Sequence, residues 1–150
     1  MRVETLLEKS ELKGLSLDLV QGVRVSPGAN PPDEYKNLSK NEGTWGAICV
    51  CGQDRFGFTA SMQLNGEGAC YTIAYSAYYR MKDLNESDVD DAVLTEFFNK
   101  VAFFLVYPYF RATLTQMAGN MEVPIPVLPV VQQGDAAFSD IEVKRPETKK

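Results

Sequence analysis

Residues that commonly carry chemistry are few in this sequence. The chain has 150 residues and no histidine, so a hydrolytic triad lacks its usual base and only lysine-based variants remain. Its densest acidic cluster is Asp88, Asp90 and Asp91, which would need oxygen ligands from elsewhere in the fold to hold a metal ion. Carboxylates at the start of a helix are stabilised by the helix dipole. We therefore assign the cluster to a helix N-terminus and predict no metal and no cofactor.

Cysteine, glycine and arginine patterns also give no enzymatic signature. Cys49, Cys51 and Cys70 are odd in number and lie in apolar runs, which is typical of buried thiols in a reducing compartment. The sequence contains no GxSxG, P-loop or GxGxxG motif. Arg111 is a candidate catalytic cation, but fixing a kinked helix or pairing across an interface is the favoured role. We predict a protein that is not an enzyme, with a small-molecule-binding or enzymatic α+β domain as the alternative.

The charge and the hydropathy pattern limit the possible partners and the location. The net charge of -5 argues against a nucleic-acid partner, because phosphate binding needs a basic patch. The apolar run from Val101 to Phe110 is too short to span a bilayer, and Pro108 interrupts it. The first residues are charged and show no signal-peptide core. These features predict a cytoplasmic protein with no membrane insertion.

Four strands are predicted in the first half of the chain. Alternating leucines begin a half-buried strand at Leu15, and a connection rich in Pro, Gly and Asn covers residues 26–43. Three further strands are predicted over residues 44–51, 56–64 and 69–80. The links between them are short, and Asn65–Gly68 is a strong hairpin signal, so these strands form an antiparallel meander.

A long helix is predicted after the last strand. Ser87 and Asp90 resemble a capping box at its start, and apolar residues then recur at helical spacing. Pro108 removes a backbone hydrogen bond and should kink the helix, which we expect to end at Gly119–Asn120. We expect one domain over residues 1–131, followed by a polar, flexible tail over residues 132–150.

The sequence holds more apolar surface than one small chain is expected to bury. Residues 101–110 are apolar around the whole helix, and the strand at residues 44–51 is apolar on both faces. The ribbon from Val123 to Pro129 contains three prolines, so it must run extended and cannot be a central strand. A contiguous apolar surface indicates self-association or the binding of other chains, and we predict both.

The order of elements and one motif resemble the SecB family of export chaperones. The motif is Leu105–Arg111 (LVYPYFR), which matches the core of the family's Leu/Phe-x-Pro-Tyr-x-Arg hallmark. Met121–Val130 resembles the segment of alternating Leu and Pro that follows it, and Lys13–Asp18 resembles the family's first strand. The resemblance extends from Leu12 to Val131, and its specific part is the Tyr107–Arg111 region.

This resemblance implies an α+β fold: a four-stranded antiparallel Greek-key sheet with a long Pro-kinked helix packed on it, assembled as a homotetramer (a dimer of dimers). It implies an ATP-independent holdase whose apolar grooves bind unfolded or precursor polypeptides, as in protein export and translocation. Gly14 and Thr72 stand where the family has acidic residues that contact the SecA motor ATPase, which predicts weakened coupling to SecA. A chaperone dedicated to an antitoxin in a toxin–antitoxin–chaperone system is the alternative.

Under this interpretation the apolar residues divide into a groove and an interface. The predicted client-binding groove consists of Tyr75, Phe104, Tyr107, Tyr109, Met117, Met121, Val123, Ile125, Val127 and Leu128. The predicted oligomer interface consists of Ile48, Val50, Phe97, Val101 and Leu105. Asp18 is the remaining candidate for a contact with SecA. We expect Ile125, Val127 and Leu128 to press client segments against Tyr75 and Phe104.

Overall fold

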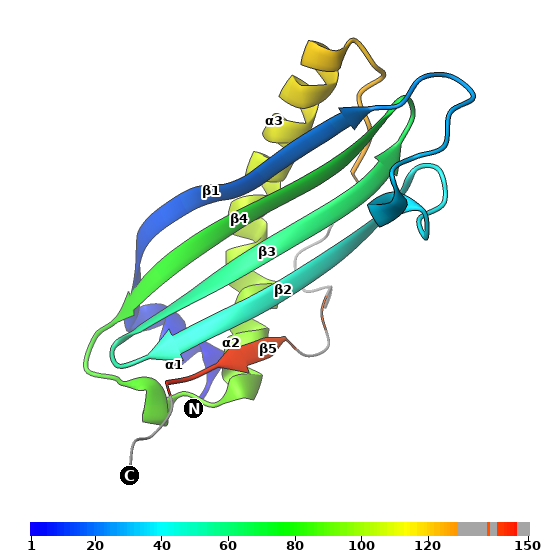
Figure 1. Cartoon of the computed structure of the whole chain (residues 1–150). Coiled ribbons are helices and arrows are strands. Elements are labelled where there is room, and N and C mark those ends of the chain that lie inside the picture. Colours follow the sequence, from blue (N-terminus) through cyan, green and yellow to red (C-terminus); the bar gives the residue numbers. More distant parts are fainter. Residues whose placement is uncertain (129–137, 139–140, 147–150) are drawn as a thin grey trace.

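A computed structural model of the chain describes residues 1–128, 138 and 141–146 (Figure 1). The elements in chain order are α1 (Val3–Glu8), β1 (Ser10–Arg24), η1 (Asp33–Tyr35), β2 (Glu42–Gly52), β3 (Arg55–Gly66), β4 (Ala69–Met81), η2 (Glu86–Asp88), α2 (Asp91–Phe97), η3 (Phe98–Ala102), α3 (Phe103–Met121) and β5 (Glu142–Lys144). The element η3 is a π-helical turn that joins α2 to α3 in one helical stretch. No helix of these described ranges combines the length and hydropathy that a membrane crossing needs.

The sheet has the order β1-β4-β3-β2-β5, and its four long strands are antiparallel. Strands β2, β3 and β4 follow one another as hairpins, and β1 lies beside β4, which is a Greek-key arrangement. The predicted four-stranded fold is therefore confirmed. The structure adds β5, which pairs in parallel with β2 and lies within the segment predicted as a polar tail. The described part of that segment therefore includes a strand, while most of its other residues lie outside the described ranges.

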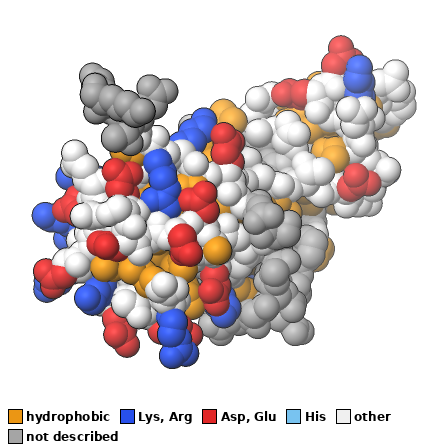
Figure 2. All heavy atoms as spheres, turned by 90° about the horizontal axis from the view of Figure 1, so that it is seen from below, with side chains coloured by type: hydrophobic (Ala, Val, Ile, Leu, Met, Phe, Trp, Pro, Cys, Tyr) orange, Lys and Arg blue, Asp and Glu red, His pale blue; other side chains and the backbone are white. Residues whose placement is uncertain are grey.

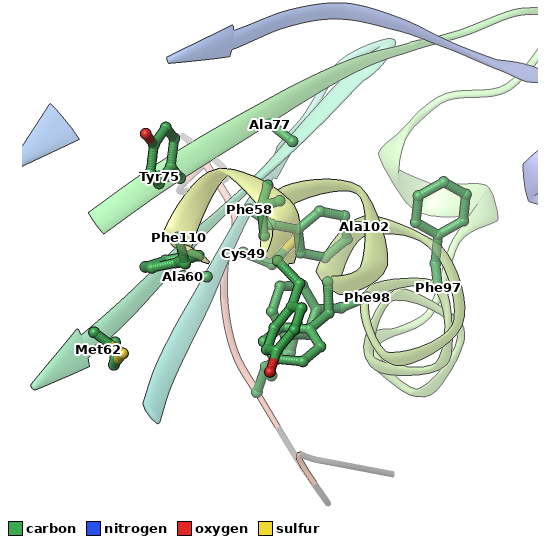
Figure 3. Packing of buried hydrophobic residues seen from close by; sticks show 14 of the residues in the cluster. Cys49, Phe58, Ala60, Met62, Tyr75, Ala77, Phe97, Phe98, Ala102 and Phe110 are labelled. Atoms are coloured by element: carbon green, nitrogen blue, oxygen red, sulfur yellow. The ribbon is translucent and has the colours of Figure 1, made fainter. Parts of the chain in front are cut away.

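One face of the sheet, here called the inner face, packs against the helical layer to form the core. In Figure 1, α3 runs behind the sheet along this face. Every second residue of β3 from Phe56 to Leu64 is buried there, as the alternating pattern predicts. The close view in Figure 3 shows Phe58 beside Phe98, and the ring centroids of these residues lie 5.3 Å apart. Each such buried ring contributes roughly 1.5–3 kcal/mol to folding.

Phe138 covers part of the apolar helical layer. The ring of Phe138 packs on Phe98 and Phe103, with centroids 5.0 and 5.6 Å away. The Asn99 side chain fixes this position, because its Nδ2 donates to the carbonyl of Phe138 (2.8 Å) and its Oδ1 accepts from the amide of Phe138 (3.0 Å). Some of the apolar surplus seen in the sequence is therefore buried within one chain.

The helix boundaries differ from the prediction at both ends. Asn85, rather than Ser87, forms a capping box, and it caps η2: its side chain accepts from the Ser87 amide, and Asp88 accepts from the Asn85 amide. The long helical stretch begins at Asp91, and its N-cap residue Asp90 forms no side-chain capping bond. At the other end, α3 continues through Gly119 and Asn120 to Met121. It stops because Glu122 adopts the left-handed conformation (φ 56°), and the amide of Val123 then donates to the carbonyl of Ala118.

Two irregularities in β1 change which side chains face the helices. Register shifts occur between Leu12 and Gly14 and between Leu17 and Leu19, so Lys13 and Asp18 are extra residues in the ladder. After the second shift, Val20 lies opposite Ile73 of β4, whereas Leu19 lies opposite Ala74. Leu17 and Val20 therefore share the inner face, and Leu19 points to the outer face.

Candidate functional site

One ridge of α3 lies along its boundary with β1. Residues Leu105, Tyr109, Thr113, Met117 and Met121 are four apart, so they form a row on one side of the helix. The core-facing side carries Phe103, Phe110, Leu114 and Ala118, all buried. The row facing β1 is only partly covered, and the Tyr109 side chain is 46% exposed.

Tyr75 of β4 forms the floor beneath this row. Its ring lies 5.8 Å from the ring of Tyr109 and 5.2 Å from that of Phe110. The hydroxyl groups of Tyr75 and Thr113 are hydrogen-bonded to each other, which satisfies the polar end of a buried side chain. The predicted pairing of Tyr75 with Tyr109 in one site agrees with this geometry.

The two methionines reach β1 because Gly22 leaves room for them. A Cβ atom on Gly22 would lie 2.7 Å from Cε of Met117 and 3.0 Å from Cε of Met121. Thioether side chains adapt their shape readily, so this end of the row can accommodate different contacts. Both methionines remain half-buried.

The strand supplies two exposed apolar side chains that the sequence analysis did not assign to the site. Leu17 lies opposite Tyr75 and is 47% exposed, and Val20 is 46% exposed. Together with Tyr109, Met117 and Met121 they form an exposed apolar strip between β1 and α3, which we call the β1–α3 strip. The alternation of Leu15, Leu17 and Leu19 gave a signal for a strand, but the bulge at Asp18 decides which of its residues reach the strip.

The ribbon that follows α3 packs on the β3–β4 hairpin. A Cβ on Gly68 would lie 3.1 Å from Val123, and a Cβ on Gly66 would lie 3.3 Å from Pro126. Leu128 is only 5% exposed and belongs to the core, so its assignment to a client groove is wrong. Val127 (88% exposed) and Ile125 point away from this packing, and their role in client binding stays a prediction.

Two further aromatic residues of the predicted groove lie elsewhere. Tyr107 is 8% exposed and packs against Phe103 and Trp45, so it is part of the core. Phe104 is half-buried beside Phe103, and no close ring contact links it to Tyr75 within the described residues. The structure therefore brings Tyr75, Tyr109, Met117 and Met121 together and separates the other groove candidates from them.

The five residues predicted for the oligomer interface do not share one surface. Ile48 is half-buried and Val50 is exposed on the outer face of β2. Val101 and Leu105 are half-buried on the helical layer, on the other side of the sheet. Phe97 is fully buried against three aromatic rings of β3 and β4, which places it in the core of one chain and not at an interface.

The candidate contact residue for SecA is tied into the sheet. The Asp18 carboxylate accepts hydrogen bonds from the hydroxyls of Ser16 (2.8 Å) and Ser76. Nearby, the hydroxyl of Thr72 is hydrogen-bonded to the hydroxyl of Tyr35 at 2.5 Å. Tyr35 belongs to η1, in the connection between β1 and β2, and its side chain is fully buried. The outer face around Thr72 is therefore covered by the chain itself.

The cysteines are structural. All three thiols are free and buried. Burial, with a smaller contribution from Cys51, raises the pKa of the Cys49 thiol to about 12, so it is protonated at neutral pH and a poor nucleophile. No group of three or more Cys, Asp or Glu side chains converges on a possible metal position anywhere in the described ranges.

Similarities to known proteins agree with this geometry. The chain is 24% identical over 138 residues to the SecB-like chaperone SmegB of Mycolicibacterium smegmatis, covering 92% of this chain and 86% of that protein. It is also similar to the solved structure of the Mycobacterium tuberculosis Rv1957 SecB-like chaperone in complex with a ChAD peptide from the Rv1956 HigA1 antitoxin. That similarity has a TM-score of 0.66 at 15% identity and covers 86% of this chain and 92% of that chain. No protein-family model matches the sequence.

The resemblance predicted from the sequence is confirmed: the chain is similar in sequence to one SecB-like chaperone and shares its α+β fold with the structure of another. The two similar proteins are named as chaperones, which agrees with the prediction of a protein that is not an enzyme.

Proposed function

We propose that this protein is an ATP-independent molecular chaperone that holds non-native polypeptides against the β1–α3 strip. The observation that carries the proposal is the exposure of Leu17, Val20 and Tyr109 beside the two half-buried methionines. Large apolar side chains gathered on one surface are a typical binding site for other chains. The similarity to SecB-like chaperones supports the same conclusion.

The proposed mechanism is the burial of apolar side chains of the client. Each Å2 of apolar surface removed from water contributes about 25 cal/mol, and this gain, summed over several apolar residues of a client segment, must offset the entropy lost on binding. Met117 and Met121 at one end of the strip allow clients of different sequence, because their side chains repack easily. No step of this mechanism requires nucleotide hydrolysis.

Two neighbouring positions of β1 provide a matched test. Leu19 and Val20 are each 46% exposed, but only Val20 is on the inner face. We expect Leu17→Ser with Val20→Ser to abolish suppression of the aggregation of an unfolded client, measured by light scattering without nucleotide. The control Leu19→Ser should suppress aggregation as the parent does. Equal activity of the two variants would contradict the proposal.

A chaperone dedicated to an antitoxin is the second candidate function. It is favoured by one observation, namely that the similar Mycobacterium tuberculosis structure is a complex with an antitoxin peptide. Under this alternative the strip accepts an apolar segment of one antitoxin. Titration with a peptide from an antitoxin encoded beside this gene would then show tight binding, while unrelated unfolded clients would still aggregate. Protection of many unrelated clients favours the general holdase.

We also propose that the chain assembles as a dimer of dimers, with the half-buried residues Val101 and Leu105 near the contact. Incompletely covered apolar residues on the helical layer support this assembly. Light scattering coupled to gel filtration should give a mass near that of four chains. A mass of one chain at micromolar concentration would contradict the proposed dimer of dimers. The β1–α3 strip of a single chain would then have to bind the client.

A further inference from the structure

A second surface feature lies on the outer face, where β2 turns into β3. A hollow of about 990 Å3 opens there, away from the β1–α3 strip. Val50 and Tyr78 line the hollow. Their sequence neighbours Cys49 and Ala77 are buried on the inner face, so Val50 and Tyr78 point to the outer face. The hollow and the strip are therefore separated by the sheet. A ligand in the hollow would leave the strip free for a client.

The floor of the hollow is apolar. Val50 is 55% exposed and Tyr78 is 49% exposed, so both present apolar surface to the hollow. The Tyr78 ring lies across Gly57, since a Cβ at that position would approach Tyr78 Cδ1 to 2.9 Å. The glycine thus lets the ring lie close to the sheet with part of it open to solvent. Pro146 closes one side by packing against Gly52.

The lining is basic, although the protein as a whole has a net charge of -5. No carboxylate lines the hollow among the residues that the structure describes. Its cationic lining residues are Lys13, Arg55, Arg80, Lys144 and Arg145. Figure 2, which views the molecule from below, shows that Lys and Arg side chains are interspersed with Asp, Glu and exposed hydrophobic ones on this face, so the basic character is confined to the lining residues.

Nearby carboxylates neutralise only part of this charge. Asp54 lies 3.2 Å from Arg80 and 3.6 Å from Arg55, and Glu11 lies 3.1 Å from Lys13. Asp91 lies 2.9 Å from Arg145. Glu11, Asp54 and Asp91 thus pair with four of the five cations, and the charge of Glu86 also acts on Arg145. Lys144 on β5 forms no ion pair with any described residue. A positive excess remains around the apolar floor.

From this combination we infer that the hollow binds an acidic segment of a partner polypeptide that carries an aromatic or aliphatic side chain among its carboxylates. The carboxylates pair with the lysines at the rim, and the apolar side chain packs on Tyr78 and Val50. Charge complementarity decides the class of partner, because an acidic segment is repelled by most of this acidic surface and attracted here. The structure thus gives the protein two polypeptide sites of different chemistry.

The test uses a short fluorescent peptide rich in Glu that contains one Trp, with binding followed by anisotropy. The charge-reversal variant Lys13→Glu with Lys144→Glu should bind the peptide about tenfold more weakly, because two rim charges now repel it. Lys36→Glu with Lys40→Glu makes the same change in net charge on the exposed connection before β2 and should leave the affinity unchanged. Equal weakening by both variants would overturn the inference, because the effect would then be one of net charge alone.

A second variant separates the aromatic contact from simple anion binding. Tyr78→Ser should weaken binding of the Trp peptide, Tyr78→Phe should keep it, and a peptide of Glu alone should bind poorly to all three proteins. If Tyr78→Ser binds as the parent does, or if an unfolded client displaces the peptide, the site is not the one inferred. A change of oligomeric mass in the charge variant would also overturn it, by assigning the hollow to a contact between copies. Aggregation suppression should be unaffected, so failure here is distinct from failure of the proposed function.

Discussion

The packing of the ribbon after α3 makes a sharp prediction, because adjacent residues have opposite environments. Leu128 is 5% exposed and Val127 is 88% exposed. Truncation of a buried leucine to alanine removes its apolar contacts and leaves a cavity, which costs about 2–5 kcal/mol. Leu128→Ala should therefore lower the free energy of unfolding by that amount. Val127→Ala should change it by less than about 0.5 kcal/mol, as is usual for surface positions.

Urea denaturation followed by the fluorescence of the lone tryptophan measures both changes. Trp45 packs on Phe103 and Phe110, with ring centroids 5.2 and 4.9 Å away, so its emission reports on the core. Both variants must be compared with the parent at one protein concentration, because assembly contributes to apparent stability. Similar losses for the two variants would refute the packing described for the ribbon. The contrast also means that Ile125 and Val127, rather than Leu128, are the positions at which client binding can be tested without loss of stability.

Three other predictions concern the thiols, the tail and SecA. The raised pKa of Cys49 keeps the folded thiol protonated, whereas the unfolded thiol ionises near pH 9. The contribution of this thiol to stability is therefore fully present below pH 9 and is lost as the pH rises towards 12. Between pH 8 and pH 11 the melting temperature of Cys49→Ala should fall less steeply than that of the parent. Arg145 donates to the carbonyls of Glu86 (2.6 Å) and Val89 (2.5 Å) and to the Asp91 carboxylate, and these bonds hold the end of β5 in place. Arg145→Ala should therefore accelerate amide hydrogen exchange in β5. Unchanged exchange would show that these bonds are not needed to hold β5. Titration against SecA should show weak or no binding, because Asp18 already accepts from two serines, whereas tight and salt-sensitive binding would contradict the weakened coupling.

Local patterns were sufficient for the main elements of this fold. The alternation in β3, the Asn65–Gly68 turn and the helical spacing after Val93 each depend on residues close in sequence, and each corresponds to an observed element. Tyr75 and Tyr109 could be assigned to one site because the family resemblance supplied the contact between the sheet and the helix.

The remaining features depend on contacts between distant residues. A bulge at Asp18 leaves the pattern of leucines regular, so the sequence does not show that Val20 and not Leu19 reaches the inner face. Strand β5 has three residues and pairs with β2 across a long stretch of chain, which no local periodicity can reveal. Leu128 and Val127 are both apolar, and only the packing of the ribbon on the hairpin distinguishes them.

Site-specific photo-crosslinking tests the central claim most directly. A photoreactive phenylalanine derivative placed at Val20 or at Met117 lies in the β1–α3 strip, whereas the same group at Leu19 is equally exposed on the outer face. After the protein is mixed with a labelled unfolded client, the strip positions should give strong crosslinks that the folded client does not give. The Leu19 position should give few. Crosslinks of equal strength at Leu19 and Val20, or crosslinks to the folded client, would contradict the account.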